Sequence, residues 1–344
     1  MSVNNYGLRA ASIDFTYKCN FRCKHCFNSS GEHNFNKEEL SKLEILNIVE
    51  QLSELKLESI CFCGGEALLK KDIVLDAAKL LKEKNSNKLS INMVSNGYMI
   101  TENVALELKK AGIRLIQISL DGAKASTHDW LRNMNGSYEK AINAIKILVD
   151  KKFYVGVAFT PTKRNIHEID DLINLCENLG VNELRVQPIM KLGRAKNIQD
   201  EFLEYIDYFK LGNKLKKANI TSKMRIEWGD PLQHIIGGRH EIPKINYLTI
   251  SAYGDLLVSP YLPITFGNIR RHSIKEYINK GLLNVWNFEF LRKLSKLIDS
   301  TETLDISDTN SNIPPIFSGN DIDFDIIDNN TKLLNDNLIK RYNL

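Results

Sequence analysis

Three cysteines lie within eight residues near the start of the chain. Cys19, Cys23 and Cys26 have the spacing C-x3-C-x2-C. The 344-residue chain has six cysteines in all, too few for its length to depend on disulfides. Such a dense set of thiols is typical of metal ligands. Three thiolates on one loop can ligate three irons of a [4Fe–4S] cube and leave the fourth iron open to a small molecule, so the spacing predicts this cluster.

A zinc ion is the alternative occupant of these thiolates. Zinc takes four ligands in a tetrahedron, so the three cysteines would need a fourth. His25 lies inside the loop, where its side chain would point away from the centre that the cysteines share, and His33 is the next histidine along the chain. The iron–sulfur cluster is therefore favoured, with zinc and His33 as the less favoured alternative.

Short β-rich runs alternate with amphipathic stretches through the first 190 residues. The predicted strands are 10–17, 59–63, 88–95, 114–120, 153–160 and 183–189. The predicted helices are 36–55, 70–84, 102–112, 138–152 and 166–180, of which the third and the last end at Gly112 and Gly180, glycines suited to left-handed C-caps. Strand–helix units in series predict an α/β fold with a parallel sheet, either open or closed into a partial barrel.

Glycine-rich and polar segments follow three of these strands. Gly64-Gly65-Glu66 follows the second, Ser95-Asn96-Gly97 the third and Ser119-Leu120-Asp121-Gly122 the fourth. Barrels of this kind carry their chemistry at the carboxyl ends of the strands. These segments are therefore the ones expected to surround the cysteine loop.

Together with the cysteine triplet, these segments resemble the radical S-adenosylmethionine (SAM) superfamily over roughly residues 10–200. The resemblance implies that Cys19, Cys23 and Cys26 ligate one [4Fe–4S] cluster and that the amino and carboxylate groups of SAM chelate its open iron. In that family, one electron from the cluster cleaves SAM to methionine and a 5′-deoxyadenosyl radical, which takes a hydrogen atom from a substrate. The protein positions the radical and excludes water and oxygen.

The resemblance also implies which residues bind SAM. The segment Gly64, Gly65 and Glu66 would hold the amino group; Ser95, Asn96, Ser119 and Asp121 would lie near the ribose and methionyl part; Arg132 would meet the carboxylate; and Phe27 would shield the cluster or the adenine. Taken alone, Asp121 before a glycine also suits an ordinary turn, and Phe27 also suits plain core packing. Both interpretations of these two residues stay open.

Cys61 and Cys63 alternate on the second predicted strand and therefore share one face. Buried free cysteines usually behave as small hydrophobic residues, and this is the favoured interpretation. The alternative makes Cys63, which directly precedes Gly64, a hydrogen-atom donor or a second redox centre beside SAM. Cys63 is therefore the candidate catalytic residue, whereas Cys176 on an outer helix is expected to be structural.

The strand–helix alternation stops after about residue 220. The run 224–228 and the two runs flanking Tyr253-Gly254 predict a small antiparallel hairpin, followed by helices over 272–280 and 283–298. Residues 250–281 resemble the hairpin region of SPASM and twitch domains, which carry auxiliary iron–sulfur clusters. Because no cysteine follows Cys176, we expect an α+β SPASM-like remnant without an auxiliary cluster.

Charge is distributed unevenly along the chain. The formal net charge is +4, yet residues 299–331 hold eight acidic residues and no Lys or Arg, so the rest is mildly basic. Scattered Lys and Arg of this kind are not a nucleic-acid-binding signature. The acidic run with Pro314-Pro315 favours a loop or a disordered tail. The apolar Ile316-Phe317 pair in that run leaves a lid over the barrel mouth as the alternative.

No apolar run approaches the ~18 residues of a membrane helix, and the first residues lack the features of a secretory signal. We therefore expect a soluble cytoplasmic protein with three parts: a partial (β/α)6 TIM-like barrel (1–220), a SPASM/twitch-like region without cluster ligands (221–298) and the acidic tail (299–344).

The expected function is a radical SAM enzyme that modifies a peptide by crosslinking, epimerisation or another C–H modification in ribosomal peptide maturation. Its expected electron donor is a reduced flavodoxin or a ferredoxin-type protein, and no nucleic-acid or membrane partner is expected. One alternative is a radical SAM enzyme acting on a small molecule or a tetrapyrrole. The other is a cluster-bearing sensor or scaffold that binds SAM without turnover.

Overall fold

The centre of the molecule is a nine-stranded sheet, seen in a computed structural model that describes residues 7–34, 36–85, 88–236 and 245–344. The strand order is β7-β6-β5-β4-β3-β2-β1-β8-β9, and every neighbouring pair is parallel except β8 and β9. The strands are β1 (Ala10–Asp14), β2 (Ser59–Cys63), β3 (Ser90–Ser95), β4 (Leu115–Ser119), β5 (Tyr154–Phe159), β6 (Glu183–Val186), β7 (Arg225–Trp228), β8 (Tyr247–Ile250) and β9 (Leu256–Leu257). The fold is α/β. In the described chain the two edge strands, β7 and β9, do not pair with each other, so the barrel is partial and open, as predicted.

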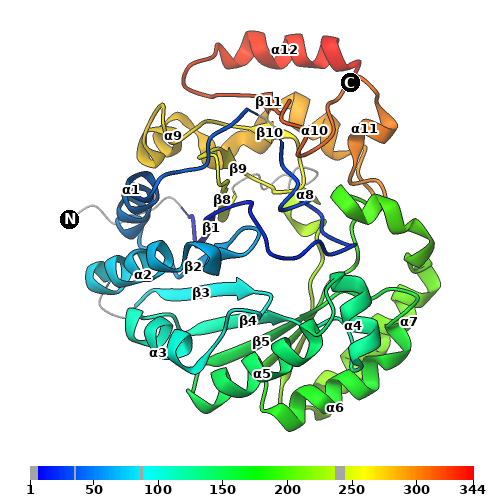
Figure 1. Cartoon of the computed structure of the whole chain (residues 1–344). Helices are drawn as coiled ribbons and strands as arrows, with labels where there is room; N and C mark the ends of the chain where they lie inside the picture. The colour runs from blue at the N-terminus through cyan, green and yellow to red at the C-terminus, as the bar shows by residue number, and fades with distance from the viewer. Residues whose placement is uncertain (1–6, 35, 86–87, 237–244) are drawn as a thin grey trace.

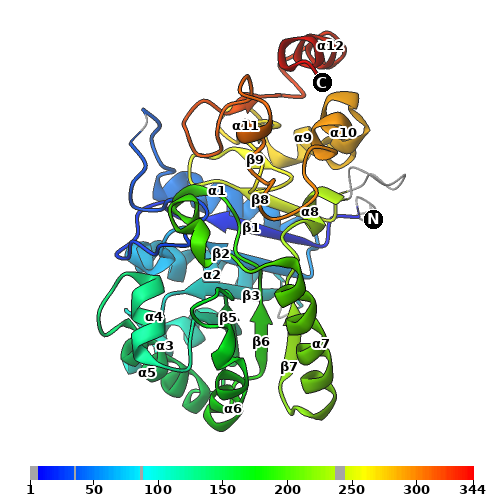
Figure 2. The same ribbon diagram turned by 90° about the vertical axis from the view of Figure 1, so that its right-hand side faces the viewer.

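Helices cover the outer face of this sheet (Figures 1 and 2). They are α1 (Lys42–Ser53), α2 (Lys71–Asn85), α3 (Glu102–Ala111), α4 (Ala125–Arg132), α5 (Ser137–Asp150), α6 (Ile169–Leu179) and α7 (Tyr205–Thr221), with the short α8 (Gln233–Ile236) after β7. The predicted C-caps are confirmed, because Gly112 has φ 109° and Gly180 has φ 78°. Helix α1 begins later than predicted because Ser41 and Glu44 form a capping box. Helices α4 and α7 were not predicted.

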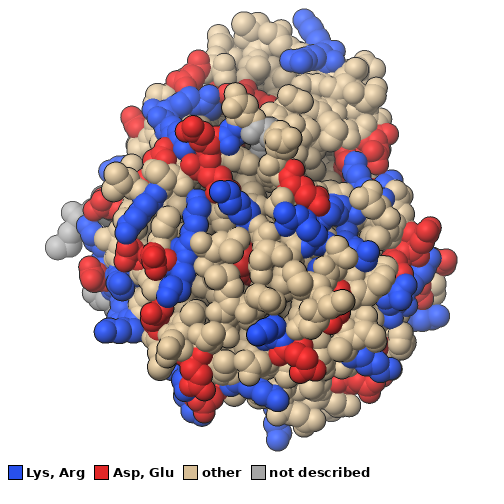
Figure 3. All heavy atoms as spheres, viewed as in Figure 1, with Lys and Arg blue, Asp and Glu red and all other residues tan. Residues whose placement is uncertain are grey.

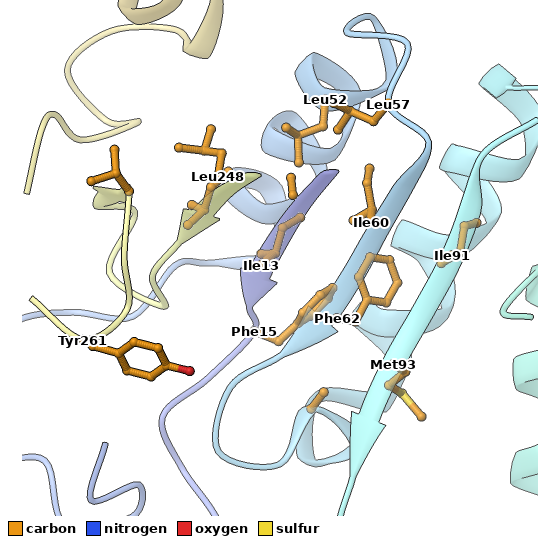
Figure 4. Packing of buried hydrophobic residues seen from close by; sticks show 14 of the residues in the cluster. Ile13, Phe15, Leu52, Leu57, Ile60, Phe62, Ile91, Met93, Leu248 and Tyr261 are labelled. Carbon is orange, nitrogen blue, oxygen red and sulfur yellow. The ribbon is translucent and has the colours of Figure 1, made fainter. Parts of the chain in front are cut away.

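Side chains alternate between the two faces of each strand. In β2, Ile60 and Phe62 are buried in the core between sheet and helices, whereas Cys61 and Cys63 face the inside of the barrel. Figure 4 shows Ile60 and Phe62 in this core, with the Phe62 ring beside Phe15 at 4.7 Å between centroids. Because successive residues of a strand point to opposite faces, the apolar core on the outside leaves the inside of the barrel free for polar groups and thiols.

The C-terminal region continues the same sheet. Strands β8 and β9 form the predicted antiparallel hairpin, but β8 also pairs in parallel with β1. The prediction that residues 224–228 belong to this hairpin was wrong, because they form β7, which pairs in parallel with β6. The helical part that follows comprises α9 (Ile274–Lys280), a 3-10 segment (Leu282–Asn287) and α10 (Glu289–Ser295).

The acidic tail is folded against this region, so the favoured prediction of a loop or disordered segment was wrong. It contains α11 (Ile306–Thr309), β11 (Ile322–Asp323) and α12 (Thr331–Tyr342), and β11 pairs in parallel with β10 (Ile264–Thr265). The buried Phe324 ring stacks on Phe290 with centroids 6.1 Å apart. Arg271 pairs with Asp323 at 2.7 Å and with the buried Asp325 at 2.9 Å. Burial of apolar side chains therefore holds the tail in place together with the ion pairs.

The surface carries mixed charge. Lys and Arg are interspersed with Asp and Glu over the face in Figure 3. No helix in the part of the chain that the structure describes is both long and apolar enough to cross a membrane.

Candidate functional site

A cavity of about 450 Å³ lies at the carboxyl ends of the strands and extends into the barrel. The predicted site residues that line it are Cys19, Cys23, Cys26, Phe27, Cys63, Gly64, Gly65, Ser95, Asn96, Ser119 and Arg132. Glu66 and Asp121, which were also predicted, do not line it. The loops after four different strands thus meet in one place, as the sequence predicts.

Residues that follow β6, on the far side of the barrel, hold the backbone of the cysteine loop, residues 19–26. Arg194, which follows β6, donates its Nε to the Cys23 carbonyl (2.8 Å) and its backbone N–H to the Cys26 carbonyl (3.0 Å). A Cβ at Gly193 would lie 2.5 Å from the carbonyl oxygen of Cys26, so only glycine allows this approach. The segment Gly193-Arg194-Ala195 resembles the sixth-strand region of the family, but the sequence assigned Arg194 no role, because its contacts with the loop span more than 160 residues of chain.

The turn after β2 packs directly on the start of the same loop. Gly65 donates its backbone N–H to the Thr16 carbonyl (2.7 Å), and a Cβ at Gly65 would lie 2.3 Å from the Lys18 carbonyl oxygen. Gly64 has φ 126°, a conformation that favours glycine. The two glycines therefore bring backbone amides to the cavity wall where a side chain would block the approach.

Glu66 connects loops instead of facing the cavity. Its buried carboxylate accepts hydrogen bonds from the Ser95 hydroxyl (3.0 Å) and the Asn96 backbone N–H (2.8 Å). Asn96 in turn donates its side-chain amide to Asn20 of the cysteine loop (2.8 Å). Burial raises the pKa of Glu66, and these donors oppose the shift. Glu66 is thus a positioning residue for the loops after β2 and β3.

Arg132 links Asp121 to the cysteine loop. Its Nη1 donates to the Cys23 sulfur at 3.8 Å, and its Nε lies 2.6 Å from Asp121 Oδ2, a charge contact whose angle is not that of a hydrogen bond. His25 Nε2 lies 3.4 Å from the same oxygen. Burial opposes ionisation of Asp121, but the charge of Arg132, together with His25, His128 and the Thr160 backbone N–H, lowers the pKa of Asp121. Asp121 lies outside the cavity and therefore holds the Arg132 side chain in place through this ion pair.

The donor set fits an iron–sulfur cluster better than a zinc ion. Within the described residues, no three His, Cys, Asp or Glu side chains converge closely enough to hold a single metal ion. A cube needs only one thiolate on each of three irons, and the three thiols face one cavity. His33, the alternative zinc ligand, instead contacts the Tyr253 hydroxyl at 3.1 Å. Burial raises the pKa of Cys23 to about 12, so this thiol needs a metal to ionise near neutral pH.

Two further thiols stand deeper in the same cavity. Cys63 donates to Cys61 with the sulfurs 3.3 Å apart, and both line the cavity instead of packing into the outer core. The hydrogen bond to Cys61 and burial raise the pKa of Cys63 well above its usual value, so its S–H bond is retained. Asp14, the β1 neighbour of Cys63, accepts from the Tyr17 hydroxyl at 3.0 Å. Asp14 was not predicted to be part of the site.

Aromatic rings from the C-terminal region close one side of the cavity. Tyr261 packs edge-on against Phe27 with centroids 5.3 Å apart, and both line the cavity. Phe317 of the acidic tail lies 5.9 Å from Phe27 and has φ 55°, a strained value for an aromatic residue. The tail thus reaches the residue that follows the last cysteine of the loop.

Residues 13–176 match the family model of the radical SAM superfamily. The chain carries a radical SAM domain. An AdoMet-dependent heme synthase from Methanosarcina barkeri is 23% identical over 309 residues, which cover 83% of this chain and 84% of that protein. The sporulation killing factor maturation protein SkfB from Bacillus subtilis is 30% identical over 247 residues, which cover 70% of this chain and 55% of SkfB. A radical SAM domain and relatives named as a synthase and a maturation protein place the chain in a class of enzymes.

The fold is similar to that of Streptococcus suis SuiB bound to S-adenosylmethionine. The TM-score is 0.68 at 15% identity, and the alignment covers 86% of this chain and 75% of SuiB. SuiB bound to its precursor peptide SuiA aligns with a TM-score of 0.60 at 15% identity over 83% of this chain and 66% of SuiB. This likeness supports the partial barrel and extends beyond the radical SAM domain.

Proposed function

We propose that this radical SAM protein cleaves SAM reductively and abstracts a hydrogen atom from a peptide substrate. Cys19, Cys23 and Cys26 would hold one [4Fe–4S] cluster, which when bound supplies the electron for cleavage. Gly64, Gly65, Ser95, Asn96, Ser119 and Arg132 would hold SAM, and Phe27 would shield it. A reduced flavodoxin or ferredoxin-type protein in the reducing cytoplasm is the proposed electron donor.

The cavity is the observation that carries this proposal. It joins the three thiols to the polar interior of the barrel without a dividing wall, so a group bound beside the cysteines faces whatever enters the barrel. Its volume of about 450 Å³ is in the range of one drug-sized ligand. Because SAM would fill part of this cavity, the remaining volume fits a single amino-acid side chain more readily than a large macrocycle. This favours a substrate that presents one residue, as a peptide does.

The likenesses support two substrate classes to different degrees. Similarity to SkfB and to SuiB, a protein seen with a precursor peptide, supports a peptide. A tetrapyrrole is the second candidate, because the heme synthase of Methanosarcina barkeri matches over 84% of its own length, a larger share than SkfB.

Cys63 is the proposed hydrogen-atom donor at the end of the reaction. The S–H bond of Cys63 would break as a C–H bond forms on the substrate radical, leaving a thiyl radical at sulfur. An electron from the external donor and a proton would then restore the thiol. This role is supported by the position of Cys63 on the cavity wall next to Gly64 and by its retained S–H bond.

Mass spectrometry of deoxyadenosine tests this function. Candidate peptides with deuterated carbon positions should transfer deuterium into 5′-deoxyadenosine, whereas a scaffold without turnover would form no deoxyadenosine with dithionite. Cys63→Ala should still form deoxyadenosine but stall before product, and the control Cys176→Ala, which changes a buried thiol outside the cavity, should give normal product. Normal product from Cys63→Ala would return Cys63 to a structural role.

A further inference from the structure

In the described chain, one arginine of the cavity has no hydrogen-bond or ion-pair partner. Arg185 lies on β6, faces the inside of the barrel and lines the cavity. Among the residues that the structure describes, it makes no hydrogen bond or ion pair through its side chain. The two other cavity arginines are neutralised, Arg132 by Asp121 at 2.6 Å and Arg194 by Glu32 at 2.8 Å. The N–H donors of the Arg185 side chain are therefore unused within the described chain.

The backbone next to Arg185 is shaped around its guanidinium group. A Cβ at Gly229, directly after β7, would lie 2.6 Å from Arg185 Nε. Gly229 donates its backbone N–H to the Val186 carbonyl at 2.8 Å, which holds this glycine against the end of β6. The absence of a side chain at position 229 thus leaves the space that the guanidinium occupies. The group is lodged in a defined position at the wall.

The neighbours of Arg185 in the cavity are neutral or engaged elsewhere. Gln187, two residues along the same face of β6, donates its amide to the Tyr261 hydroxyl at 3.4 Å. The one acidic side chain that lines the cavity in the described chain, Asp14, stands on β1 and accepts from the Tyr17 hydroxyl at 3.0 Å. Glu227, opposite Arg185 on β7, and Glu183, two residues before it on β6, both pair with Arg225, at 3.3 Å and 3.2 Å. None of these residues accepts a hydrogen bond from Arg185 in the described chain, so its guanidinium is open to a bound molecule.

We propose that Arg185 recognises a carboxylate of the substrate. A half-buried guanidinium is costly without an anion, and its planar fork of N–H donors matches a carboxylate with two parallel hydrogen bonds. A peptide can offer this group as an acidic side chain or a C-terminus, and a tetrapyrrole can offer it as a propionate. The inference deepens the proposed function, since it rests on the substrate entering this cavity.

Binding of acid and neutral probe pairs tests the proposal. The first pair is coproporphyrin III and its tetramethyl ester. The second is a pool of synthetic decapeptides with Glu at the central position and the matching pool with Gln. Dissociation constants are measured with the cluster-loaded protein in the presence of SAM, for the wild type, Arg185→Gln and Arg185→Lys. The control Arg9→Gln removes an exposed arginine outside the cavity that pairs with Glu58 at 2.8 Å.

The wild type should bind at least one acid probe roughly tenfold more tightly than its neutral partner, the scale of one charge-assisted pair. Arg185→Gln should abolish this preference, Arg185→Lys should retain part of it, and Arg9→Gln should keep it. The pair that shows the preference identifies the source of the carboxylate. Equal binding of acid and neutral probes by the wild type, or an unchanged preference in Arg185→Gln, would overturn the proposal.

SAM binding and uncoupled deoxyadenosine formation are measured on the same proteins. Both should be unchanged in Arg185→Gln, because Arg132, which donates to the Cys23 sulfur, is the arginine proposed to hold SAM. Loss of SAM affinity in Arg185→Gln would contradict the proposal by assigning Arg185 to the SAM carboxylate. Absence of deoxyadenosine from the wild type would instead refute the proposed function while leaving the carboxylate preference to stand or fall on its own measurement.

Discussion

At some positions of this site only one residue type fits, because any other side chain would clash with a neighbouring group. Gly65 is an example, because a Cβ there would meet the Lys18 carbonyl oxygen at 2.3 Å, well inside van der Waals contact. Backbone carbonyls cannot rotate away as side chains do, so the turn or the cysteine loop would have to move. The residue therefore couples the shape of the β2 turn to the position of Cys19.

Gly65→Ala should lower both stability and cluster loading. Overpacking of this kind costs about 1–3 kcal/mol, and displacement of the loop should reduce the iron bound per chain. Gly212→Ala is the matched control, because nothing lies within 4 Å of a Cβ there and alanine favours the interior of α7 by about 1 kcal/mol. Chemical denaturation and iron analysis measure the two effects. Equal stability and equal iron in Gly65→Ala and the wild type would contradict the role of this contact.

The pH dependence of stability should report the environment of Asp14. Burial raises the pKa of Asp14 to about 6 in the folded chain, and the Tyr17 hydroxyl bond opposes the shift only in part. The folded state then binds the proton more tightly than the unfolded state, whose Asp pKa is about 3.9. Stability should therefore fall as pH rises from about 4 to about 6 and stay lower above that range.

Asp14→Asn removes this ionisation while keeping an acceptor for Tyr17. The variant should exceed the wild type in unfolding free energy at pH 8 by up to about 3 kcal/mol, the equivalent of about two pKa units. The difference should vanish below about pH 3, where the wild-type carboxyl is protonated in both states. Urea denaturation of the cluster-free protein across this range provides the measurement. A difference independent of pH would show that Asp14 ionises freely in the fold.

At the scale of elements, local sequence patterns predicted the strands and the helix ends, which depend on residues close together in the chain. The six strands up to residue 189 follow from apolar runs, and Gly112 and Gly180 mark real helix ends. The run 224–228 was assigned to the wrong partner because its apolar pattern predicts a strand but not what the strand pairs with. Its pairing with β6 joins residues 42 positions apart in the chain. The tail was wrongly predicted to be a loop or disordered segment for a related reason. Its composition is mostly acidic and polar, and only a few apolar residues in it pack against the rest of the fold.

Phe324 should carry much of the docking of the tail. It is fully buried between Phe266, Phe288 and Phe290. Phe324→Ala should cost about 3–5 kcal/mol, whereas Leu333→Ala on the exposed side of α12 should change stability by less than about 0.5 kcal/mol. High salt should not reproduce the loss, because apolar burial is not screened as ion pairs are. A tail released by salt alone would contradict this account.

At the scale of the whole molecule, an open barrel brings distant segments to one cavity. Residues that directly follow a strand could be predicted as parts of the site, because parallel strands end at the same edge. Arg194 could not, because its contacts with the cysteine loop join residues more than 160 positions apart in the chain. The division of the chain at residue 220 stays a prediction, since the sheet continues across it through β7 and β8.

Iron analysis of the reconstituted protein tests the central claim most directly. If Cys19, Cys23 and Cys26 hold a single cube, anaerobic reconstitution should give about four irons per chain. Substitution of all three cysteines by alanine should leave essentially no iron and no deoxyadenosine with dithionite, while changing Cys61, Cys63 and Cys176 together should leave about four irons in place. About eight irons per wild-type chain, or a cluster that survives in the Cys19, Cys23 and Cys26 variant, would contradict the account.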